Sequence, residues 1–228
     1  MPAHTSAGCF WWMIQKDLTR EVRAQHIWPR TLLLALVLVL LQATQVDLPV
    51  EQKAGVIGGL LWITVFFSGT LAIERSFASE HEGACWQALL LYPIAPSAIF
   101  LAKMLANFVS IIILQLAVIP LFIVLTDVRL LDRPGSMALI VVLGSVGFAS
   151  VGTLIGALTA GLQNRGGLLA LVLLPLVAPI LMSSAEATRI MLAGHNDPLW
   201  WWWTQLLATF AVVFTVVGAM AFSVVMEE

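Results

Sequence analysis

Six long apolar stretches run through this chain, and they restrict its fold more than any other feature. A helix that crosses a bilayer needs about 20 mostly apolar residues, because the hydrocarbon core is about 30 Å thick. Only 11% of the 228 residues are charged, against about 25% in a typical soluble domain. We therefore predict one all-α integral membrane domain over residues 1–228, with transmembrane helices at about 28–46, 54–73, 98–126, 137–162, 167–184 and 204–226.

The distribution of basic residues predicts that both ends of the chain lie in the cytoplasm, because cytoplasmic loops carry an excess of Lys and Arg. In this multi-pass topology Lys103, near the start of the third span, is expected to extend its ammonium group back to the interface. The 11 basic residues divide into a cytoplasmic set of Lys16, Arg20, Arg23, Arg30, Arg75, Lys103 and Arg165, and an outer set of Lys53, Arg129, Arg133 and Arg189.

Residues 10–28 have the pattern of a helix that lies in the membrane interface. Apolar residues recur at helical spacing on one side, and charged residues occupy the other, which favours contact with both lipid tails and anionic headgroups. A disordered basic tail is the alternative, although a tail does not require an apolar stripe. The apolar positions are Trp11, Ile14, Leu18 and Val22, and the charged ones are Lys16, Asp17, Arg20 and Arg23.

The stretch from Glu74 to Lys103 is the most polar interruption between two spans. Residues 76–92 place Phe77, His81, Leu89 and Tyr92 on one helical face, which predicts an amphipathic helix on the cytoplasmic side. A helix in this position is typical of a membrane protein that is driven by a cytoplasmic partner. The residues predicted to contact that partner are Glu74, Arg75, Glu80, Glu82 and Gly83.

Small and cyclic residues mark two of the later spans. Gly152 and Gly156 form a Gly-x-x-x-Gly face, which predicts a close contact between helices. Pro175 and Pro179 each remove a backbone hydrogen bond, so the fifth span is expected to be broken or strongly kinked near its middle.

Two features leave alternatives open. Asn107 and Gln115 in the third span are interpreted either as helix-to-helix hydrogen bonds or as contacts to a transported polar group. The outer segment 185–203 contains His195 and four consecutive tryptophans, beginning with Trp200 and Trp201. The tryptophans are interpreted either as an aromatic belt at the interface or as a platform for a flat hydrophobic ligand, with His195 as an iron ligand.

The sequence lacks the patterns that an energy-converting or catalytic protein needs. A phosphate-binding loop requires Gly-x-x-x-x-Gly-Lys-Ser/Thr, whereas the three lysines follow Gln15, Gln52 and Ala102. We find no metal-binding or nucleophile motif, and a net charge of −2 gives no reason to expect nucleic acid. The chain is therefore predicted not to be an enzyme, and the energy for any work that it does is expected from a partner.

Several local patterns together resemble the haem exporter protein B family (CcmB), and the resemblance covers nearly the whole chain. The first group lies around the end of the second span and the start of the third. The second group follows the fourth span. The matching residues are Ala72-Ile73-Glu74-Arg75 with Phe77, Leu89 to Pro96, Leu101-Ala102-Lys103, Leu158-Thr159, Gly161-Leu162, Arg165 to Leu168, Leu174-Pro175 and Ala178-Pro179.

The resemblance implies a permease-like fold of the type-2 ABC exporters, in the bacterial inner membrane. It also implies a place in cytochrome c maturation, beside an ATPase subunit (CcmA), a haem-handling membrane subunit (CcmC) and a small membrane subunit (CcmD). ATP would act only through the ATPase. Haem would be substrate rather than a covalently bound cofactor, with His195, Trp200 and Trp201 as candidate contacts to haem or to a periplasmic partner.

Two alternatives keep the same fold. The chain is either a permease for another hydrophobic substrate, such as a lipid or polysaccharide, or a membrane scaffold through which the ATPase acts on a neighbouring subunit. Loss of c-type cytochromes on deletion separates the first alternative from haem export, and haem movement by the reconstituted complex separates the second.

Overall fold

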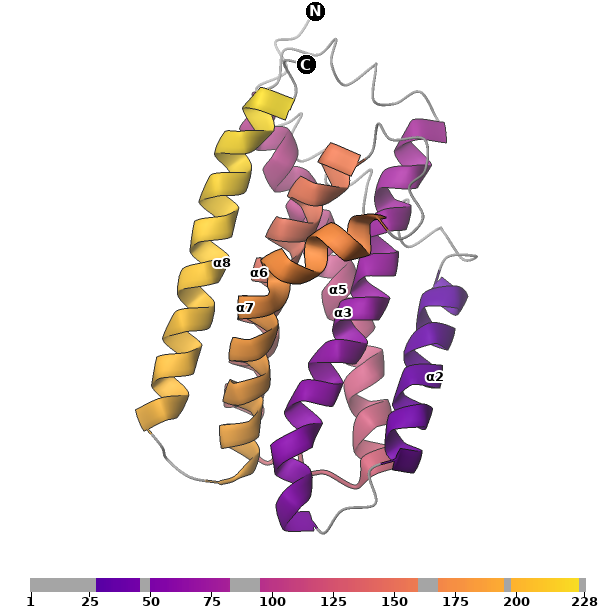
Figure 1. Cartoon of the computed structure of the whole chain (residues 1–228), viewed down its shortest axis with the longest axis vertical. Coiled ribbons are helices and arrows are strands. Elements are labelled where there is room, and N and C mark those ends of the chain that lie inside the picture. Colours follow the sequence, from indigo (N-terminus) through magenta and orange to yellow (C-terminus); the bar gives the residue numbers. More distant parts are fainter. Residues whose placement is uncertain (1–27, 46–49, 83–94, 160–167, 195–197, 226–228) are drawn as a thin grey trace, which may run out of the picture.

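The computed structural model describes residues 28–45, 50–82, 95–159, 168–194 and 198–225, and all regular secondary structure in these ranges is α-helical. Consecutive helices run in opposite directions and form one bundle (Figure 1). The helices are α2 (Trp28–Gln45), α3 (Val50–Glu82), α5 (Pro96–Thr126), α6 (Pro134–Thr159), α7 (Leu168–Leu192) and α8 (Pro198–Val225).

Five of these helices, α3 and α5 to α8, are long and apolar enough to cross a membrane. Helix α2 has 18 residues, slightly fewer than the about 20 that a span needs. The all-helical fold is thus confirmed, and the five long helices are those of an integral membrane protein. A sixth span formed by α2 stays a prediction, as does the interfacial helix over residues 10–28, which lies outside the described residues except for Trp28.

Three helices extend further than the sequence pattern indicated. Helix α3 does not end at the charged pair Glu74-Arg75 but continues to Glu82. Helix α7 reaches Leu192, and α8 already begins at Pro198, so most of the segment expected as an outer loop over 185–203 is helical. Charged and tryptophan residues are compatible with helix formation, so they mark the membrane interface without ending a helix.

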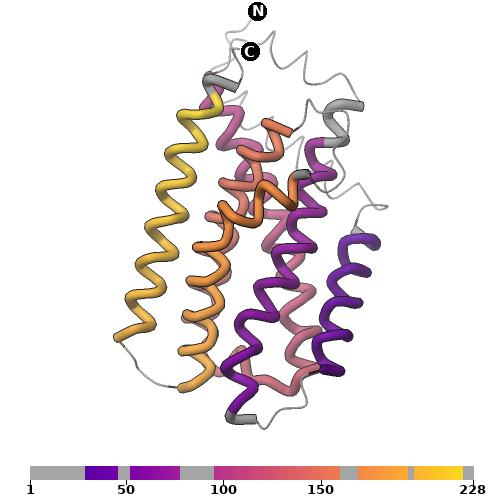
Figure 2. The backbone as a smooth tube through the Cα atoms, viewed as in Figure 1, coloured from indigo at the N-terminus to yellow at the C-terminus, as the bar shows by residue number. Residues whose placement is uncertain are grey.

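The arrangement of the helices places α6 at the centre of the bundle, against α3, α5, α7 and α8. Helix α2 packs on α3 and α5 at one edge, and α8 lies at the opposite edge (Figure 2). We call the end of the bundle where α3, α6 and α8 finish the upper end, which is at the top in Figure 1, and the opposite end the lower end.

Hydrogen bonds between side chains link the helices inside the bundle. Asn107 and Gln115 of α5 donate to hydroxyl groups of α6, which matches the first of the two interpretations of these residues. The bonds are Asn107 Nδ2 to Thr153 Oγ1 at 2.8 Å, Gln115 Nε2 to Ser145 Oγ at 3.1 Å, Trp62 Nε1 to Thr188 Oγ1 at 3.1 Å, and a hydroxyl pair between Ser150 and Thr215 at 2.7 Å.

Removing the acceptor of the Trp62 indole is expected to destabilise the contact between α3 and α7. Thr188→Val keeps the side-chain shape but leaves the buried indole N–H without its acceptor, and interhelical bonds of this kind contribute about 0.6–1.7 kcal/mol in membrane proteins. Thermal unfolding in detergent measures the loss. The control is Thr209→Val, because Thr209 is exposed and its hydroxyl donates to the Gln205 carbonyl of its own helix. An equal effect of the two substitutions would contradict this expectation.

Cationic side chains cap two helices at the lower end. Lys53 Nζ, near the start of α3, donates to the Thr126 carbonyl at the end of α5, at 3.1 Å. Arg133 Nη2 donates to the Gly194 carbonyl just after α7, at 2.8 Å. Cations at helix C-termini are stabilising, because the last carbonyl groups have no partner within the helix and carry partial negative charge.

Helix α7 is continuous through Pro175 and Pro179 but changes direction in its N-terminal half (Figure 1). Each proline lacks the N–H that would bond to the carbonyl four residues earlier. The Ser183 hydroxyl donates to the Pro179 carbonyl at 2.7 Å, which adds a local bond where the backbone ladder is interrupted. The bend tilts the start of α7 away from the axis of the bundle.

Candidate coupling site

Helix α3 is longer than a membrane span requires. Its 33 residues give a length of about 50 Å at 1.5 Å per residue, against about 30 Å for the hydrocarbon core. The long uncharged stretch of α3 ends at Ile73, and the helix continues to Glu82. The last turns of α3, from Glu74 to Glu82, therefore extend past this stretch and carry four charged residues at the upper end of the bundle (Figure 1).

The residues predicted to contact a partner are distributed along this end of α3. Glu74 and Arg75 lie on the helix and are half-buried. Glu80 and Glu82 belong to its last turns, and Gly83 lies outside the described residues. Residues 76–82, expected to begin a separate coupling helix, continue α3 without a break. The remainder of that predicted helix, from 83 to 92, lies outside the described residues.

Helix α3 packs against α6 along a seam in which a large side chain of one helix faces a glycine of the other. A Cβ atom added at any of these glycines would overlap the side chain opposite. Residues four apart lie on the same face of a helix, so the seam repeats at each turn of its upper part. From the lower to the upper end, the pairs are Trp62 with Gly144, Phe148 with Gly69, Ile73 with Gly152, and Phe77 with Gly156.

The sequence pattern pointed to Gly152 and Gly156 but not to the side chains opposite them. The structure places Ile73 and Phe77 of α3 against these two glycines. Ile73 and Phe77 are four residues apart, as are the two glycines. This equal spacing is the sequence signal that could have predicted the contact between α3 and α6. A single sequence does not show which of the other helices lies against a glycine face.

The Lys103 side chain is buried beside this seam, so the expectation that it extends to the interface is wrong. Its residue is 3% exposed, and its Nζ lies 4.7 Å from the centroid of the Phe77 ring. An ammonium group over an aromatic ring is attracted to it by about 0.5–2 kcal/mol, with the larger values where water is excluded. Phe77 thus contacts α5 through Lys103 and α6 through Gly156. We call these three residues the Phe77 cluster.

A hydrogen bond next to the Phe77 cluster connects α5 directly to α6. Asn107 lies one helical turn after Lys103, and its side chain donates to Thr153, which lies between the two seam glycines. Both side chains are buried. The upper parts of α3, α5 and α6 therefore meet in one packed region, and the projecting end of α3 leaves the bundle from it.

The tryptophan run lies at the lower end, in the first turns of α8. Trp200 and Trp203 pack against the hydrophobic core, whereas Trp201 and Trp202 are 61% and 59% exposed. The buried Trp200 indole N–H has no acceptor among the described residues. His195 lies outside those residues, so a contact of His195 and the tryptophans with haem stays a prediction.

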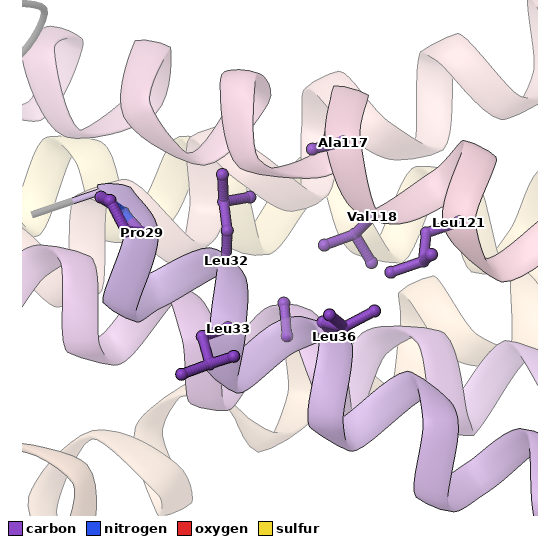
Figure 3. Close-up of a pocket in the computed structure, with 8 residues that line it drawn as sticks. Pro29, Leu32, Leu33, Leu36, Ala117, Val118 and Leu121 are labelled. Carbon is purple, nitrogen blue, oxygen red and sulfur yellow. The ribbon is translucent and has the colours of Figure 1, made fainter. Parts of the chain in front are cut away.

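A hollow of about 340 Å³ lies between α2 and α5. Leu32 and Leu36 of α2 face Val118 and Leu121 of α5 across it (Figure 3). The side chains that line it are aliphatic apart from Pro29, so they supply neither an iron ligand nor a partner for a charged group. Elsewhere in the described ranges, no group of three or more His, Cys, Asp or Glu side chains is arranged to hold a metal ion.

Comparison with known proteins shows one family that matches nearly the whole chain. The family model described as CcmB protein matches residues 8–228. The heme exporter protein B of Rhodobacter capsulatus is 31% identical over 179 residues, which cover 78% of this chain and 81% of the relative. That of Pseudomonas aeruginosa is 28% identical over 169 residues (73% and 75%), and that of Escherichia coli K12 is 27% identical over 182 residues (78% and 80%).

Proposed function

Because the chain belongs to the CcmB protein family, we propose that it is a membrane subunit of a haem export complex. It is a non-catalytic permease subunit in cytochrome c maturation, and it couples ATP hydrolysis by a separate subunit to haem export or to release of a haem-loaded carrier. Its partners are a CcmA-like ATPase, a CcmC-like haem-handling subunit and a small CcmD-like subunit. The name of the relatives, heme exporter protein B, supports haem as the substrate.

The observation that carries the proposal is the projecting end of α3. A long helix that runs without a break from the lower end, through the seam with α6, and past the end of its uncharged stretch at Ile73 can move as one body when its end is displaced. Its polar end carries Glu80 and Glu82, and the half-buried pair Glu74-Arg75 lies two turns below. These residues form the receiving surface for the ATPase.

The proposed site of action is the bacterial inner membrane, with the upper end of the bundle in the cytoplasm. Seven of the 11 basic residues are on the cytoplasmic side in this orientation. The start of α2 and the end of α8 both point toward the upper end, which supports termini on the same side (Figure 1).

Reversing the charge of the projecting end of α3 is expected to separate the chain from its ATPase. Lysine at both Glu80 and Glu82 replaces attraction by repulsion toward a basic partner surface, at a cost of several kcal/mol, so affinity falls at least about tenfold. Copurification of the ATPase, its activity and the yield of holocytochrome c measure the effect.

The matched control is Asp132→Lys, because Asp132 is exposed at the opposite end of the bundle. We expect this control to leave copurification and cytochrome yield unchanged. If the double lysine variant behaved like the control in all three measurements, the proposed receiving surface on α3 would be wrong.

A further inference from the structure

Burial of Lys103 requires a reason other than packing. A buried ammonium group is costly in an apolar environment, whereas leucine or methionine would fill the same space without this cost. The long lysine stem could also reach toward the interface, as such side chains often do near helix ends. Instead the residue is 3% exposed, and its Nζ lies over the Phe77 ring. Its position therefore favours a specific contact with α3.

From these contacts we infer that the Phe77 cluster is the joint through which α3 moves α5 and α6, with Lys103 as a positioning residue. This inference rests on the proposed function, because it assigns the transmission step to three residues. Phe77 is the residue of the seam that lies nearest the end of α3. A displacement of the projecting end thus reaches Phe77 before any other member of the seam.

The two contacts of Phe77 differ in kind, and each has a separate mechanical role. Against Gly156 the ring meets backbone with no side chain between, so the ring and α6 are held in one register. Against Lys103 the contact is an electrostatic attraction, which opposes separation of α3 from α5 and tolerates small lateral shifts without a steric clash. The cluster therefore holds α3 firmly on α6 and pulls α5 along with it.

The hydrogen bond from Asn107 to Thr153 completes the joint. It fixes α5 to α6 one turn below Lys103, at 2.8 Å between buried groups. Movement of Lys103 with Phe77 therefore tilts the upper end of α5 about this bond. Because α5 and α6 both contact α8, the tilt is passed across the bundle to the edge opposite α2.

The test uses the intact complex of the chain with its ATPase subunit. Lys103→Met keeps the length of the side chain and removes its charge, and Lys103→Arg keeps the charge. Loss of the cation–π contact predicts about a fivefold loss of ATPase stimulation in Lys103→Met and less than about a twofold loss in Lys103→Arg. Leu105→Met is the control, because Leu105 lies on the same helix and is exposed.

Copurification separates this joint from the proposed function. Undiminished copurification with lost stimulation in Lys103→Met, and rescue by arginine, would support the joint. If wild type stimulates the ATPase and Lys103→Met stimulates it equally, the joint is refuted and the proposed function stands. If the wild-type chain neither copurifies with nor stimulates an ATPase, both are refuted.

A double-mutant cycle tests whether Lys103 acts through Phe77. Phe77→Leu retains an apolar side chain but removes the ring that faces the ammonium group. Because residues that act through one contact are not additive, the Phe77→Leu and Lys103→Met variant should lose no more stimulation than the stronger single variant. Multiplied fold-losses would show that the two residues act separately and would refute the joint.

Discussion

Gly58→Ala is expected to cause the largest loss of stability of any single methyl addition to α3. A Cβ atom at Gly58 would lie 2.5 Å from the Ala185 carbonyl oxygen and 3.3 Å from the Arg189 backbone nitrogen, both in α7. Backbone atoms within a helix cannot rotate away, so α3 and α7 would have to separate. Overpacking of this kind costs about 1–3 kcal/mol or more, which thermal unfolding in detergent would measure.

The adjacent glycine provides the control for this substitution. A Cβ atom at Gly59 would have no atom of another helix within 4 Å, so Gly59→Ala adds the same methyl group to the same helix without a clash. We expect its unfolding temperature to equal or slightly exceed that of wild type, because alanine is the better helix former. Equal destabilisation by the two substitutions would show that α3 and α7 are not in close contact at this point.

Gly156→Ala is expected to displace the Phe77 ring and to reduce both stability and ATP-coupled activity. The added Cβ atom would lie 2.6 Å from two ring carbons of Phe77, and this ring is buried between helices with little space to move. The expected loss is about 1–3 kcal/mol in the free energy of unfolding. Because the ring also contacts Lys103, ATPase stimulation should fall as well.

A smaller side chain at position 77 should relieve the clash. In the Gly156→Ala background, Phe77→Leu is expected to recover stability but not ATPase stimulation, because the contact with Lys103 remains absent. Gly135→Ala serves as the control on the same helix, since a Cβ atom there has no neighbour within 4 Å. Recovery of stimulation together with stability would show that the ring matters only for packing.

The positions of the helices could be predicted from the sequence because length and hydropathy are local properties. The apolar stretches gave the helices to within a few residues at the start of α2 and at the end of α5. Helices α3 and α8 extend past the span ends predicted at Ile73 and Thr204, because charged and aromatic residues mark the depth of the interface, whereas a helix ends only where its backbone bonds stop.

Only part of the candidate site could be predicted from the sequence. Gly152 and Gly156 stand out by spacing, but the choice of α3 as their partner depends on the order in which helices pack. The position of the Lys103 side chain was predicted wrongly for a physical reason. A lysine near the end of a span usually extends to the interface. The ammonium group instead lies over the Phe77 ring, and no local sequence pattern reveals this contact. Contacts between residues far apart in the sequence determine both the partner of the glycine face and the direction of the Lys103 side chain.

The cationic caps at the lower end also bear on how the chain is inserted. Lys53 and Arg133 neutralise the carbonyl ends of α5 and α7, and Arg189 pairs with Glu186 at 2.6 Å. Three of the four basic residues that would have to cross the membrane in the proposed orientation thus have local acceptors after translocation. In the proposed orientation these acceptors stabilise the three basic side chains on the far side of the membrane, where the charge bias alone would disfavour them.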